Sequence, residues 1–67
     1  MNMIAVHSSN VKAIGYDPNA KIMHVEFETG TYVHERVEPD AYRRFMAASS
    51  KGSHYHVHFK GGHAGKV

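Results

Sequence analysis

Apolar and polar residues alternate along residues 21–28, with an apolar side chain at nearly every second position. A period of two is typical of a half-buried strand, because successive side chains of a strand point to opposite faces. The earlier run 11–17 is rich in β-branched and aromatic residues, and the run 30–37 alternates again. Gly30 suits a tight turn between the last two runs. The pattern therefore predicts three strands of an antiparallel meander.

The spacing of apolar residues lengthens after Pro39, where a helix over residues 39–49 is predicted. Proline suits the first turn of a helix because the N–H at that position has no helical partner. Asp40 then places a negative charge near the positive end of the helix. Gly52 can take the left-handed conformation that ends a helix. The stripe expected to face the sheet consists of Tyr42, Phe45, Met46 and Ser49.

Residues 54–59, with the sequence HYHVHF, alternate once more and predict a returning strand. Three glycines between positions 61 and 65 predict a flexible Gly-rich tail over residues 61–67. We therefore expect one domain, residues 1–60, followed by this tail. The predicted fold class is α+β: a small antiparallel β-meander with one α-helix packed on it and a returning C-terminal strand.

Several short motifs follow one another in the order of a known family. Their order from Ser8 to about Lys60 resembles the KTSC domain, a short family named after the C-terminus of some lysyl-tRNA synthetases. In this sequence the motifs are Ser8-Ser9, Ile14-Gly15-Tyr16-Asp17, Val25-x-Phe27-x-x-Gly30, Tyr32-x-His34, Val37-x-Pro39 and Ala48-x-Ser50-x-Gly52.

The sequence departs from that family in three places. His34 replaces the second tyrosine of a Tyr-x-Tyr pair, and Pro39 comes one residue later than expected. His54-Tyr55-His56 stands where the family has an aromatic pair followed by asparagine. The resemblance mainly implies the fold, since a fold alone does not carry a function. It also implies RNA as a partner, because some members are attached to a tRNA enzyme. Other members are small stand-alone bacterial or phage proteins.

Length and composition narrow the function classes. The 67-residue chain has no cysteine, which excludes disulfides and a cysteine-based zinc site. No apolar run approaches the ~20 residues that span a bilayer, so we expect a cytoplasmic protein without membrane contact. No nucleophile-elbow or phosphate-loop pattern is present, and so small a domain offers little depth for a water-excluding pocket. We therefore expect no enzymatic activity.

Charge is unevenly distributed. Residues 36–67 hold six Lys and Arg against two acidic residues, whereas residues 1–35 carry a net charge of −2. Aromatic rings beside cations are what single-stranded nucleic-acid binders present to bases and phosphates. The alternatives are that Tyr32 packs in the core and that the cations only keep the domain soluble. The candidate nucleic-acid contacts are Tyr32, His34, Arg36, Arg43, Arg44, Lys51 and Lys60.

The histidine-rich segment suggests metal chemistry. On a strand, His54, His56 and His58 would share one face, and neutral imidazoles are good ligands for zinc or nickel. A row of histidines on a solvent-exposed face, with only adventitious binding of metal, is the alternative. We therefore expect a small non-enzymatic binding module for RNA or single-stranded nucleic acid. A protein-interaction module, such as a phage-type regulator or inhibitor docking on a host enzyme, and a histidine-based metal binder remain alternatives.

Overall fold

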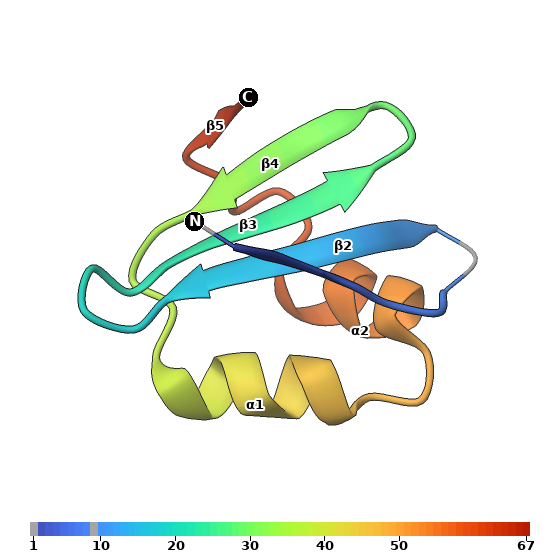
Figure 1. Ribbon diagram of the computed structural model, residues 1–67, viewed down its shortest axis with the longest axis horizontal. Coiled ribbons are helices and arrows are strands. Elements are labelled where there is room, and N and C mark those ends of the chain that lie inside the picture. Colours follow the sequence, from blue (N-terminus) through green and yellow to red (C-terminus); the bar gives the residue numbers. More distant parts are fainter. Residues whose placement is uncertain (1, 9) are drawn as a thin grey trace.

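The computed structural model describes residues 2–8 and 10–67, so Ser9 of the Ser-Ser motif lies outside the described residues (Figure 1). Five antiparallel strands form one sheet in sequence order, and two helices pack on one face of it. The elements are β1 (Met3–Ala5), β2 (Val11–Asp17), β3 (Ile22–Phe27), β4 (Gly30–His34), α1 (Pro39–Ala47), α2 (Lys51–His58) and β5 (Gly65–Lys66). The α+β meander is confirmed, with one helix more than predicted.

The core lies between the sheet and the helices. Ile14, Met23 and Val25 project from β2 and β3, and Phe45 of α1 and Tyr55 of α2 cover them. The register pairs Ile14 with Val25 and Val25 with Tyr32, so these side chains share the face that the helices cover. The period-two pattern of residues 21–28 thus correctly identified the buried face of β3.

Helix α1 begins at Pro39 as predicted and ends at Ala47, two residues early. Phe45 of the predicted stripe is fully buried, whereas Ser49 is exposed beyond the helix. The aromatic rings of Tyr16 and Tyr42 stack at a centroid distance of 4.3 Å, which ties α1 to β2. The Tyr16 hydroxyl also donates a hydrogen bond of 2.6 Å to the Val37 carbonyl, just before the helix.

The strand predicted over residues 54–59 is wrong, because this segment belongs to helix α2. The Ser50 hydroxyl caps the helix by accepting a hydrogen bond from the Ser53 amide. Tyr55 is buried, but Val57 is 74% exposed, as helical geometry allows and an alternating strand does not. Gly52 therefore lies inside the first turn of α2 and does not cap α1.

The glycine-rich segment predicted as a flexible tail folds back onto the sheet. Gly65 and Lys66 form β5, which pairs antiparallel with β4. The Ala64 amide donates to the Val33 carbonyl at 2.7 Å, and the Val67 amide donates to the Thr31 carbonyl at 2.6 Å. In the part of the chain that the structure describes, no helix is both long and apolar enough to cross a membrane.

Candidate aromatic cleft

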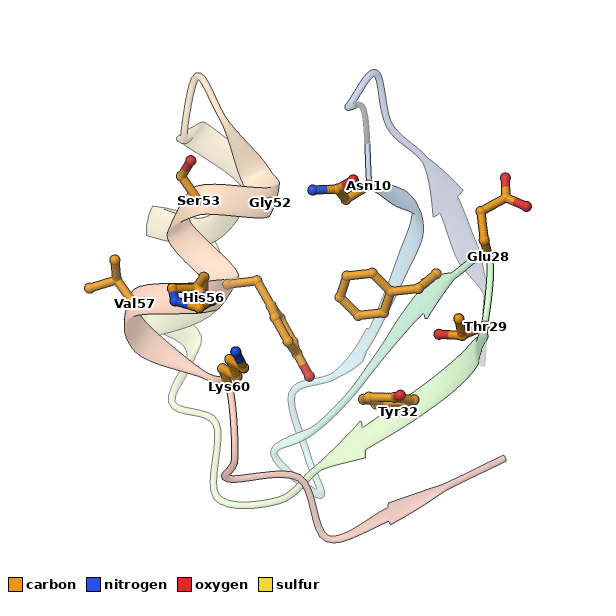
Figure 2. Close-up of a pocket in the computed structure, with 11 residues that line it drawn as sticks. Asn10, Glu28, Thr29, Tyr32, Gly52, Ser53, His56, Val57 and Lys60 are labelled. Carbon is orange, nitrogen blue, oxygen red and sulfur yellow. The ribbon is translucent and has the colours of Figure 1, made fainter.

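A cleft of about 730 Å³ opens between α2 and the β3–β4 hairpin (Figure 2). Its aromatic walls are Phe27, at the end of β3, Tyr32 of β4 and Tyr55 of α2. The Phe27 ring lies 5.6 Å from that of Tyr32 and meets the Tyr55 ring edge-on at 4.8 Å. Offset and edge-on contacts of this kind are favourable for aromatic rings. The cleft is therefore a preformed surface on which a planar or apolar group could pack.

His34 lies beneath the cleft and fixes the orientation of Tyr55. It is only 3% exposed, and its Nε2 atom lies 2.8 Å from the Tyr55 hydroxyl oxygen. Burial lowers the pKa of His34, and His63 lowers it further, while a hydrogen bond with the Gly62 backbone acts in the opposite direction. Burial likewise raises the pKa of Tyr55, followed by the effect of Tyr32. Both groups are thus held neutral near pH 7.

Polar groups border the cleft at both ends. Figure 2 shows Lys60 and Tyr32 on opposite walls at one end, and the Asn10 side chain pointing toward Gly52 at the other. The two walls approach closely at the second end, because a Cβ atom on Gly52 would lie 3.1 Å from the Asn10 side-chain nitrogen. The cleft is thus aromatic in its middle and polar at both ends, an arrangement that suits an elongated ligand.

The charges around the cleft are mixed. The carboxylate of Glu28 lies at the rim and pairs with Lys12 at 3.3 Å. Lys66 of β5 places its Nζ atom 5.5 Å from the centroid of the Tyr32 ring, within cation–π range. Lys66 therefore supplies positive charge near Tyr32, and Lys60 supplies it within the cleft, while Lys12 offsets the one carboxylate among the lining residues.

The structure brings only two of the predicted nucleic-acid contacts, Tyr32 and Lys60, into the cleft. His34 supports the cleft from below instead of lining it. Arg36 is exposed beyond the end of β4 and does not line the cleft.

The remaining predicted basic contacts lie outside the cleft as well. Arg43 and Arg44 both pair with Asp40 on α1, at 3.0 and 2.8 Å. The ammonium group of Lys51 donates to the Ala48 carbonyl at 3.0 Å. The basic residues of the C-terminal half therefore do not form one continuous surface around Tyr32.

Sequence reasoning missed Phe27, Tyr55 and Asn10 as residues of the cleft. Phe27 was placed on the core face of β3, where it does lie, and nothing in the alternation shows that its ring is partly uncovered. Tyr55 was assigned to a strand. A signal that could have located it is the four-residue spacing between Tyr55 and Phe59, which is that of one helix face.

The three candidate metal ligands do not share a face. His54 and His58 lie one helical turn apart, with ring centroids separated by 4.3 Å. His56 points elsewhere and lines the cleft. Among residues 2–8 and 10–67, no group of three or more His, Cys, Asp or Glu side chains is arranged to hold a metal ion. The predicted three-histidine row is wrong, because it depended on a strand.

The comparisons with known proteins agree with this fold. A model of the KTSC domain family matches residues 7–63. The chain belongs to the KTSC domain family. Its KTSC domain is 38% identical over 64 residues to an uncharacterized protein of Stutzerimonas stutzeri, covering 94% of this chain and 90% of that protein. A protein of Tsukamurella paurometabola is 39% identical over 51 residues, covering 75% and 76% of the two chains.

A solved structure of the same family shows the same architecture. The crystal structure of a KTSC domain protein from Yersinia pestis matches with a TM-score of 0.93 at 35% sequence identity, over 98% of this chain and 96% of that one. The resemblance drawn from the short motifs is thus confirmed. The structural match covers nearly the whole chain and so includes α2, which forms one wall of the aromatic cleft in this protein.

Proposed function

We propose that this KTSC domain is a small non-enzymatic binding module that takes single-stranded nucleic acid, RNA in particular, in the aromatic cleft. The observation that carries the proposal is the grouping of Phe27, Tyr32 and Tyr55 around one open cleft beside Lys60. Bases of any sequence can stack on such rings, and single-stranded binders combine them with cations that meet the phosphates. A cytoplasmic location, where RNA is abundant, is part of the proposal.

The positions of the charges suggest how one nucleotide is held. Lys60 lies on the wall opposite Tyr32, so a base packed on the aromatic rings can place its phosphate near the ammonium group (Figure 2). Lys66 adds a second cation beside Tyr32. With only these two phosphate contacts, log affinity should fall with log salt with a slope of about −1.4. A steeper slope would mean that more cations contact phosphates than Lys60 and Lys66 alone, so that the binding surface extends beyond the cleft.

Fluorescence anisotropy with a labelled single-stranded oligonucleotide tests the proposal. Tyr32→Leu removes the ring while keeping an apolar side chain, and it should weaken binding by about 5- to 150-fold, the effect of losing one stacked base. Tyr32→Phe keeps the ring and should bind as the parent does. Equal affinity of the parent and Tyr32→Leu, with both folded by circular dichroism, would reject the cleft as the nucleic-acid site.

A charge-matched pair of variants isolates the role of Lys60. Lys60→Ala and Arg43→Ala each remove one positive charge from an exposed side chain, but only Lys60 lines the cleft. Lys60→Ala should weaken binding and make the salt dependence shallower, whereas Arg43→Ala should change both only slightly. Equal losses in the two variants would indicate binding by overall charge.

A protein partner is the second candidate, because Val57 is 74% exposed beside the aromatic cleft. Exposed apolar groups next to a cleft are typical of surfaces that bind a peptide. Affinity for a protein partner should depend little on salt and should fall on Val57→Ser. The oligonucleotide experiments above separate the two candidates, since a peptide-only cleft would bind no nucleic acid in the parent.

A further inference from the structure

Two histidines of α2, His54 and His58, form a pair that the cleft does not use. They are four residues apart, and residues at this spacing are neighbours on a helix surface. Their ring centroids lie 4.3 Å apart with an angle of 32° between the rings. Two histidines at the same spacing on one helix face also bind zinc in helical metal motifs. The pair therefore has the spacing of a bidentate chelate.

The position of His54 is fixed by the core. Its ring stacks on that of Phe45, with centroids 5.4 Å apart and an angle of 16° between the rings, and Phe45 is fully buried. His58 is exposed and can turn toward an ion from solvent. One ligand is thus preorganised and the other is free to close on the metal.

We propose that His54 and His58 form a two-imidazole site for a divalent late transition-metal ion, such as Cu²⁺, Ni²⁺ or Zn²⁺. Imidazole nitrogens suit these ions, whereas Mg²⁺ and Ca²⁺ prefer oxygen ligands. Because no group of three or more potential ligands is found among the described residues, water or an external ligand completes the coordination. The affinities should follow the general order for such sites, with Cu²⁺ bound more tightly than Ni²⁺ or Zn²⁺.

A competing histidine pair, His34 and His63, is less suitable. Their ring centroids lie 6.3 Å apart, and the Nε2 atom of His34 is already hydrogen-bonded to Tyr55 in the core. A metal at this pair would have to displace either that bond or the hydrogen bond of His34 with the Gly62 backbone, and it would enter a site that is almost closed to solvent. His54 and His58 need no such rearrangement.

Titration calorimetry with NiCl₂ alone, on a chain without an affinity tag, tests the proposal. His58→Ala should weaken binding by about tenfold or more, because the second ligand of a chelate binds at a high effective concentration. His56→Ala is the matched control, since it removes an exposed histidine two residues away on the same helix. It should bind Ni²⁺ as the parent does, with one ion per chain.

The variants also give a readout that only a site on the folded chain produces. Excess Ni²⁺ should raise the melting temperature of the parent and of His56→Ala, because a ligand that binds the native state stabilises it. It should leave that of His58→Ala nearly unchanged. Equal losses of affinity in His56→Ala and His58→Ala, or none in His58→Ala, would overturn the proposed pair. His54→Ala is a poor test, because it also removes the ring stacked on Phe45.

Discussion

The hydrogen bond between His34 and Tyr55 connects the core to the cleft. His34 is almost fully buried, and its Nε2 atom lies 2.8 Å from the Tyr55 hydroxyl oxygen. The described residues contain no buried side-chain nitrogen or oxygen atom without a hydrogen-bond partner. Each of the two residues therefore satisfies a buried polar atom of the other, and changing one alone should be costly.

A double-mutant cycle measures this dependence. Tyr55→Phe leaves His34 Nε2 buried without its partner and should reduce the free energy of unfolding by about 1–3 kcal/mol. His34→Phe combined with Tyr55→Phe replaces both partners by apolar groups of similar shape and should restore most of that loss. Urea denaturation of the parent, both single variants and the double variant supplies the four values. A double variant as unstable as the sum of the single variants would show that the two residues act independently.

The same pair makes the stability of the protein depend on pH. Because burial lowers the pKa of His34 in the folded state, the unfolded chain binds a proton more readily. The stabilisation that His34 contributes is fully present above about pH 6.5, the ordinary pKa of histidine in the unfolded chain. It is lost as the pH falls from there through the lower pKa of His34 in the folded state. His54, whose pKa is also lowered, acts in the same direction.

Urea denaturation between pH 8 and pH 5 measures this loss. The parent should be most stable above pH 6.5 and lose stability below it. The His34→Phe, Tyr55→Phe double variant should show a smaller loss, which His54 then contributes. A profile of the double variant identical to that of the parent would exclude His34 as the source.

At the scale of elements, sequence patterns predicted β2, β3, β4 and α1 but not α2. The alternation of residues 21–28 extends over eight residues, whereas HYHVHF offers only six residues, which also place Tyr55 and Phe59 on one helix face. Both patterns put the same two aromatic rings inside, but the strand would also bury Val57, whereas the helix exposes Val57 and packs His54 against Phe45. The Ser50 cap, three residues before Ser53, favours the helix but is a weak signal in a serine-rich turn.

Alanine substitutions at Val57 and Phe45 separate the helical arrangement from the strand. Val57→Ala should leave the melting temperature unchanged or raise it slightly, because the side chain is exposed and alanine is the better helix former. Phe45→Ala should cost about 3–5 kcal/mol, because the ring is fully buried between α1 and the sheet. A large loss from Val57→Ala would instead mean that this side chain is buried, as in an alternating strand.

At the scale of the whole molecule, the cleft arises from segments that are distant in sequence. Tyr32 and Lys60 were recognisable from their residue types, but their partners come from the end of β3, the start of β2 and α2. Local patterns cannot show that both helices lie on the same face of the sheet (Figure 1) or that a cleft opens between α2 and the β3–β4 hairpin. For the same reason, local patterns could not show that Lys60 lines the cleft whereas Arg43 and Arg44 lie outside it, where both form ion pairs with Asp40 on α1.

The C-terminal segment is the clearest case in which tertiary contacts override a local signal. Glycine content predicted a flexible tail, yet β5 pairs with β4 and the His63 ring lies 4.8 Å from that of Tyr32. A chain that ends at Gly62 would lose the hydrogen bonds made by the Ala64 and Val67 amides. Truncation also removes the β4–β5 pairing, so it should cost at least about 1–3 kcal/mol, the contribution of these two bonds at about 0.5–1.5 kcal/mol each.

The truncated chain should still unfold cooperatively, because the fully buried residues Val11, Ile14 and Met23 belong to β2 and β3. Lys66→Ala separates the two contributions of the segment, since it keeps the backbone pairing but removes the cation near Tyr32. It should cost little stability and weaken oligonucleotide binding, whereas truncation should reduce both. Urea denaturation of the parent, the truncated chain and Lys66→Ala measures the first effect, and anisotropy measures the second. A truncated chain as stable as the parent would mean that residues 63–67 behave as the tail their composition suggests.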